Sequence, residues 1–115
     1  MPNTTTVVTP AALAPVIKPV TGTTYTIVAG DLAGNVVLAF DSASATTVTV
    51  PANIGTAPAS VDLVARGGGQ VTLVAASGVT LNAADGSLRT RVRYSAATLL
   101  RTGTNTWHAS GDLVA

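Results

Sequence analysis

The stretch TTVTVP, residues 46–51, alternates hydroxyl and apolar side chains until it reaches a proline. Successive side chains of a β-strand point to opposite faces, so Val48 and Val50 share one face and the threonines at 47 and 49 share the other. Pro51 ends the strand, because proline has no backbone N–H to donate to a sheet ladder. The stretch therefore predicts a strand with one apolar and one polar face.

The same character continues through most of the chain. From Thr23 onward, short segments rich in Val, Thr, Ile and Leu are separated by Gly, Asn, Asp and Pro about every eight to twelve residues, a spacing typical of sandwiches and barrels. Strands are expected at residues 24–28, 36–40, 46–50, 60–65, 70–75, 79–81, 89–94, 98–102 and 107–113. We therefore predict an all-β domain over residues 23–115, a compact antiparallel β-sandwich or barrel-like fold.

Two glycine-containing turns are expected to be hairpins within this domain. Gly67-Gly68-Gly69 separates two β segments, and Gly103-Thr104-Asn105 separates residues 98–102 from Trp107. Glycine and asparagine adopt the positive φ that tight hairpin turns require. Both turns are therefore predicted to connect neighbouring antiparallel strands.

The first residues differ from the β region. They contain four prolines that recur too closely for a helix longer than about one turn, at Pro2, Pro10, Pro15 and Pro19. We therefore predict an extended arm over residues 1–22. The apolar side chains of the arm have no period that would bury them locally, so they are expected to contact a partner: Val7, Val8, Leu13, Val16 and Ile17. A frayed terminus is the alternative.

The composition includes few side chains that can take part in catalysis or bind a metal ion. The 115 residues include no cysteine, no glutamate and one histidine, and charged residues make up only 10%. Catalytic sites need side chains that titrate, coordinate a metal or attack a substrate. We therefore expect a protein that is not an enzyme and that binds no cofactor or metal ion.

The surface is expected to be partly covered in an assembly. Hydrophobic residues make up 47% of the chain and the formal net charge is +1, so little charge repulsion opposes association. A homotrimer is the predicted oligomer. No run approaches the roughly 20 apolar residues of a membrane span, and no signal peptide is evident, so no membrane partner is expected.

His108 and the aromatic residues are weaker candidates for a site. His108 has only Asp112 near it in the sequence and a metal site needs further ligands, so an ordinary strand residue is expected. The four aromatic residues are dispersed along the chain, so Trp107 and Tyr94 are predicted to anchor the core. A sugar-binding role of Trp107 is the alternative.

Arg89, Arg91 and Arg93 concentrate positive charge in one short segment. At a spacing of two residues they share one face of the strand expected at 89–94. Three interpretations stay open: a solvated face that protects an edge strand, a contact with an acidic protein surface, and a contact with an anionic glycan or nucleic acid. Nucleic acid is the least favoured, because no broader basic patch or aromatic stacking partners accompany the arginines.

Several motifs occur in a fixed order along the β region. They are TVTVP at 47–51, GQVTLV at 69–74, SGVTL at 77–81, YSAATLL at 94–100, Trp107 and GDL at 111–113. In combination they resemble a β module of tailed-bacteriophage virion proteins, found on tail fibres, minor tail proteins and head-decoration or head-fibre proteins. The resemblance covers about residues 23–113. It implies a structural protein, frequently trimeric, without catalytic residues.

The resemblance also bears on location. In tail proteins the module usually belongs to a longer chain with coiled-coil, collagen-like or β-helical shaft segments, which this sequence lacks. A head-decoration protein is therefore expected, made in the bacterial host cytoplasm and bound to the major capsid protein lattice on the virion surface. The alternatives are a tail-fibre or minor-tail module that binds a host receptor or surface glycan, and a bacterial surface or adhesion module.

Overall fold

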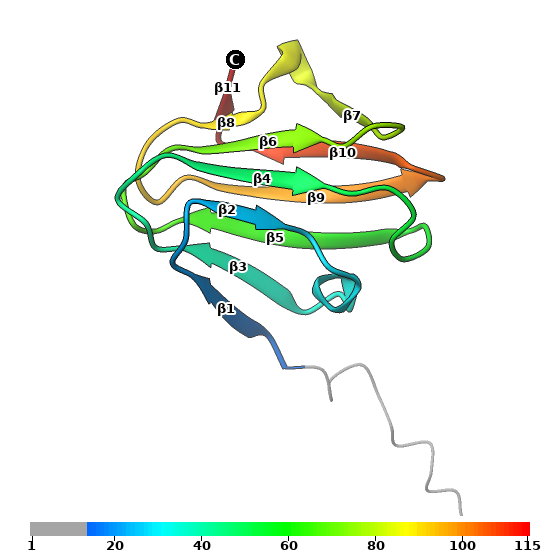
Figure 1. Cartoon of the computed structure of the whole chain (residues 1–115), viewed down its shortest axis with the longest axis horizontal. Coiled ribbons are helices and arrows are strands. Elements are labelled where there is room, and N and C mark those ends of the chain that lie inside the picture. The colour runs from blue at the N-terminus through cyan, green and yellow to red at the C-terminus, as the bar shows by residue number, and fades with distance from the viewer. Residues whose placement is uncertain (1–13) are drawn as a thin grey trace, which may run out of the picture.

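Two β-sheets lie face to face in the computed structural model, which describes residues 14–115 (Figure 1). The strands of sheet A, in spatial order, are β1 (Val16–Val20), β3 (Val36–Phe40), β5 (Ala59–Ala65), β9 (Ala96–Gly103), β10 (Thr106–Gly111) and β7 (Thr80–Ala83). Those of sheet B are β11 (Leu113–Val114), β8 (Arg89–Thr90), β6 (Val71–Ala75), β4 (Thr46–Val50) and β2 (Thr24–Thr26). The all-β prediction is confirmed.

Helical structure in residues 14–115 is limited to two short 3-10 helices, η3 (Ala29–Leu32) and η4 (Ala84–Gly86). Each connects two strands of different sheets. No helix in the described part of the chain is long and apolar enough to cross a membrane.

The chain winds between the two sheets. From β1 to β8 every connection crosses from one sheet to the other, so β1, β3 and β5 stack in sheet A while β2, β4 and β6 stack in sheet B. These stacked neighbours are parallel, with Val16 beside Val36 and Thr46 beside Val71. Each circuit therefore takes roughly 20 to 25 residues, which is the arrangement of a β-solenoid.

The hairpin formed by β9 and β10 interrupts this winding. β9 pairs antiparallel with β5 and with β10, and β10 pairs parallel with β7. The hairpin thus occupies the place beside β5 that β7 would take in a continuing solenoid. Its turn lies between Gly103 and Thr106, so the hairpin predicted there is confirmed.

The predicted antiparallel strand directions are wrong for the wound part of the domain. Five of the nine strand pairings within residues 14–115 are parallel. Side-chain alternation has a period of two in both kinds of sheet, so it did not distinguish them. Whether two strands pair parallel or antiparallel therefore depends on the loop that connects them, not on the strand sequence.

The glycine-rich loop after β5 shows what such a connection requires. It carries the chain from sheet A to sheet B, so the hairpin predicted at Gly67-Gly68-Gly69 is wrong. A Cβ on Gly67 would overlap the backbone of Asp41, and one on Gly69 would overlap that of Ser44. Glycine therefore allows the loops of successive circuits to stack in close contact.

The core between the sheets follows the alternation expected from the sequence. Thr46, Val48 and Val50 are buried on one face of β4, whereas Thr47 is exposed on the other. Trp107 is only 1% exposed, which confirms it as a core residue, but Tyr94 is 63% exposed and its prediction as a core anchor is wrong. The other large buried side chains include Phe40, Ile27, Leu38, Leu63, Leu73 and Leu99.

Sheet A begins earlier than predicted. Residues 16–20, assigned from the sequence to the extended arm of residues 1–22, form β1 and pair with β3. Val16 donates its N–H to Asn35 O, so the backbone N–H positions of alternate residues from Val16 point toward β3. The backbone nitrogen of Pro19 therefore faces the open edge, where no N–H is needed. The other apolar residues predicted to bind a partner, Val7, Val8 and Leu13, lie outside the described residues.

Replacing the buried indole should destabilise the fold severely. Trp107→Ala is expected to lower the free energy of unfolding by about 3–5 kcal/mol, because it removes a fully buried aromatic side chain. Leu100→Ala is the matched control: Leu100 lies on the adjacent strand β9, is 41% exposed, and should cost about 1 kcal/mol or less. Chemical denaturation followed by circular dichroism measures both, and equal losses would contradict the assignment of Trp107 to the core.

Candidate partner-binding surface

Only one of the three candidate arginines lies in a strand. Arg89 belongs to β8, which ends at Thr90, and residues 91–95 form a turn. The prediction that the three arginines share one strand face is therefore wrong. Thr90 gives the reason: its buried Oγ1 accepts the N–H of Val71 at 2.9 Å, so a side chain replaces the backbone carbonyl that a longer β8 would offer to β6.

Arg91 fastens the base of the 91–95 turn. Its Nε and Nη2 donate to the two carboxylate oxygens of Asp112 at 2.7 and 3.0 Å, and Ser95 Oγ donates to the same carboxylate at 2.8 Å. The hydrogen bonds from Arg91 and then Ser95 hold the pKa of Asp112 below its ordinary value, and Asp112 raises the pKa of Arg91. The charge of Arg91 is thus largely used within the chain.

The tip of the same turn is exposed. Tyr94 is 63% exposed and Val92 is 50% exposed, while the guanidinium carbon of Arg93 lies 4.9 Å from the centroid of the Tyr94 ring. Arg93 Nε also donates to the carbonyl of Arg66 at 3.0 Å. Val92, Arg93 and Tyr94, called the turn tip below, therefore offer apolar, aromatic and cationic groups side by side.

Arg89 interacts with the C-terminal strand and not with the turn tip. Its Nη2 donates to the carbonyl of Ala115, and its strand neighbour across sheet B is Val114. Of the three candidate arginines, only Arg93 therefore combines exposure with a place at the turn tip.

The outer face of sheet A beside β1 is a second candidate surface. Leu38 and Leu63 are buried in the core, so Val37 of β3 and Asp62 and Val64 of β5 lie on the outer face. The apolar residues on this face, with those of β1 and β9, form what we call the apolar face: Ile17, Pro19, Val37, Val64 and Ala96. Ile17 is 52% exposed, and Val16 at the start of β1 is 48% exposed.

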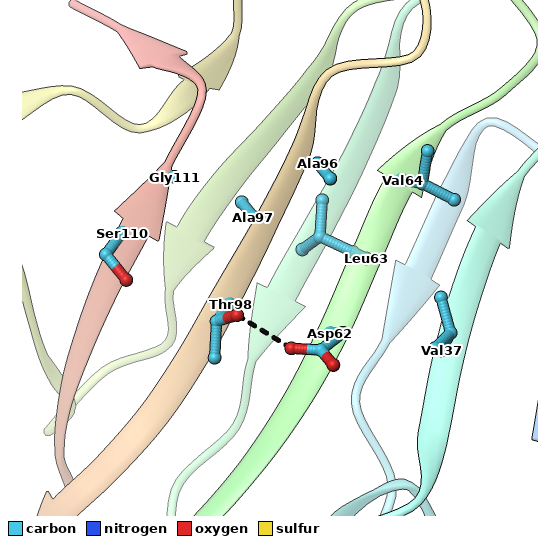
Figure 2. A pocket seen from close by; sticks show the side chains of 9 residues that line it. All are labelled: Val37, Asp62, Leu63, Val64, Ala96, Ala97, Thr98, Ser110 and Gly111. Atoms are coloured by element: carbon cyan, nitrogen blue, oxygen red, sulfur yellow. Dashed lines mark hydrogen bonds between the residues drawn. The ribbon is translucent and has the colours of Figure 1, made fainter. Parts of the chain in front are cut away.

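A shallow hollow of about 460 Å³ adjoins the apolar face (Figure 2). Thr98 Oγ1 donates to Asp62 Oδ1 at 2.7 Å across β5 and β9, and Asp62 is the only titratable residue in the lining. Small residues leave the space open, among them Ser110 and Gly111, where a Cβ would meet the backbone of Ala96 at 2.5 Å. An open hollow with one carboxylate suits contact with a partner better than catalysis.

The most polar cluster of the described residues closes one end of the core. Lys18 of β1 and Tyr25 of β2, the edge strands of the first circuit, both bond to the buried carboxylate of Asp31. Lys18 Nζ lies 3.0 Å from Asp31 Oδ1 and 2.7 Å from Tyr25 Oη, and Tyr25 Oη donates to Asp31 Oδ2 at 2.5 Å. The Tyr25 ring packs edge-on against Phe40 of the next circuit.

The electrostatics of this cluster favour a structural role. Burial and then the hydrogen bond to Asp31 raise the pKa of Tyr25, and the hydrogen bonds to Tyr25 and Asp31 raise the pKa of Lys18. A tyrosine or lysine that acts as a base near neutral pH needs the opposite shift. The cluster therefore covers the end of the apolar core with satisfied polar groups.

Within the described residues, the structure does not pair His108 with Asp112. His108 is exposed on β10, and the carboxylate of Asp112 is engaged by Arg91 and Ser95. Within residues 14–115 no group of three His, Cys, Asp or Glu side chains is placed to hold a metal ion.

The polar cluster predicts a loss of stability at alkaline pH. Both raised pKa values mean that the folded state favours protonated Lys18 and protonated Tyr25, so their contribution is present below about pH 10 and is lost as the pH rises through the folded values. The free energy of unfolding should therefore fall above pH 10, and the fall should be smaller in Tyr25→Phe. Urea denaturation at a series of pH values measures this, and identical alkaline slopes for both proteins would contradict the role assigned to the cluster.

No protein-family model, curated protein or solved structure matches this chain.

Proposed function

We propose that this chain is a non-enzymatic structural protein of a tailed-bacteriophage virion, which binds the outer surface of the capsid lattice. The proposal is supported by the ordered motifs from TVTVP at 47–51 to GDL at 111–113, which resemble a module of such virion proteins. The observation that carries it furthest is the apolar face of sheet A, where Ile17 remains 52% exposed among other apolar side chains. Exposed apolar surface of this kind is typical of protein contacts.

The position of β1 suits this attachment. Asn35 Nδ2 donates to the carbonyl of Ala14 at 2.7 Å, which fixes the start of the described chain beside β3. Residues 1–13 therefore join the domain next to the apolar face, and a segment of that length spans at most roughly 45 Å.

Such a protein would act by mass action. A ligand that binds the assembled lattice and not the separated subunits stabilises the lattice by RT ln(1 + [L]/Kd) at each site. Repetition over many equivalent sites allows a modest affinity at one site to strengthen the whole shell. No catalytic residue, cofactor or metal ion is required for this activity.

Binding to particles lacking the protein tests the proposal. Purified wild-type protein should cosediment with such particles, and Ile17→Asp should reduce occupancy at fixed concentration at least tenfold, because a carboxylate would be buried in the apolar contact. Val74→Asp is the matched control, since Val74 is 40% exposed on β6 of the opposite sheet. It should bind as the wild type does.

Two outcomes would contradict the proposal. Wild-type protein that leaves the particles bare but binds host cells would favour the receptor- or glycan-binding tail module. Equal loss of occupancy in both variants would show that the apolar face is not the surface that contacts the particle. Circular dichroism of each free protein shows whether the β fold is retained.

A further inference from the structure

We infer that the turn tip is a preformed docking contact for a protein surface that presents a carboxylate beside an apolar patch. The inference rests on the proposed function, since the capsid lattice is the protein surface in question. It adds Val92 and also Tyr94, which the sequence predicted to anchor the core, and it separates Arg93 from the other two arginines.

The backbone at Tyr94 is the first observation. Its φ is +71°, in the left-handed region that bulky residues rarely adopt. The ring does not compensate by packing into the core, since it is 63% exposed and lies against the guanidinium group of Arg93. A conformational strain without burial at an exposed aromatic residue points to a role of the side chain outside the fold.

The turn is held rigid around this strained residue. Tyr94 N donates to Ala65 O at 2.6 Å, and Ala65 N donates to Ser95 O at 2.9 Å, so the turn is bonded to the end of β5. Within the turn, Ser95 N donates to Val92 O, and Val92 N donates to Ser95 Oγ, each at 3.0 Å. Because the turn tip is already fixed, binding of a partner costs little conformational entropy for ordering the turn.

The guanidinium group of Arg93 is available to a partner. Arg66 pairs with Asp41 at 2.6 Å and Arg91 pairs with Asp112 at 2.7 Å, but Arg93 forms no ion pair with any residue of 14–115. Only its Nε is engaged, by a backbone carbonyl, so its two terminal nitrogens remain able to donate to a carboxylate.

The neighbouring charges favour a protein over a polyanion. Asp41 pairs with Arg66 and Asp112 pairs with Arg91, so two of the three guanidinium groups around the turn tip are neutralised and a phosphate backbone would meet little net positive charge. Tyrosine and arginine are, with tryptophan, the residues enriched at the energetic centres of protein interfaces. The turn also leads directly into Ala96 of the apolar face, so one partner surface can cover both.

Removing the ring while relieving the strain separates binding from folding. Tyr94→Asn places a residue that tolerates positive φ at this position, so its unfolding midpoint should equal or exceed that of the wild type, while particle occupancy falls at least tenfold. Tyr94→Gly is the second variant. Asp85→Asn is the control, because Asp85 is exposed with a φ of +55° in η4, and it should leave occupancy unchanged.

Arg93→Gln tests the carboxylate. Rising salt should weaken particle binding of the wild type and have little effect on the residual binding of Arg93→Gln. Full occupancy by both Tyr94 variants, with Ile17→Asp still defective, would overturn this inference and leave the proposed function standing. Wild-type protein that fails to bind particles would overturn both.

Two further results would assign the turn tip to another occupant and overturn the inference. Tyr94-dependent oligomers in light scattering without particles would identify a second copy of this chain. Tyr94-dependent binding to purified host polysaccharide, with particle binding unchanged, would identify a glycan.

Discussion

Parallel stacking of successive chain circuits is the constraint on which the rest of the structure depends. In sheet A, Leu38 stands beside Leu63, and in sheet B, Val48 stands beside Leu73, so each circuit places apolar side chains directly next to those of the last. This register buries a continuous core only if the connecting loops also stack. Gly67 and Gly69 satisfy that condition, because no side chain would fit against the loop of the previous circuit.

A stacked fold also has to end, and the two ends of this one are closed differently. At the first circuit, Lys18, Tyr25 and Asp31 cover the core with hydrogen-bonded polar groups, and Pro19 removes a donor from the open edge of β1. At the other end, the β9–β10 hairpin lies beside β5, turns sheet A antiparallel and inserts Trp107 into the core, and β7 and β11 form the outer edges of the two sheets. The polar cluster thus covers the first end of the core, and the hairpin replaces parallel stacking beside β5.

The sequence was sufficient for the strands and their buried faces, because alternation at Val48 and Val50 reports burial directly. It was insufficient for strand direction, which depends on where each connection leads. Residues 16–20 form a strand despite two nearby prolines, because Pro19 faces the open edge of sheet A, and the sequence alone does not show which edge is open. No local signal showed that Thr90 ends β8, and alternation carried past that point placed Tyr94 in the core, on the opposite side from its true position.

The sequence identified the candidate surfaces only in part, because it did not show where β8 ends. Arg93 was found from charge alone, whereas Val92 and Tyr94 became visible only once the 91–95 turn replaced the expected strand. Electron cryomicroscopy of purified virions tests the account most directly. We expect two-sheet density on the outer capsid surface, with sheet A toward the shell and the 91–95 turn in contact with it. Density confined to the tail, or a domain bound through sheet B, would contradict it.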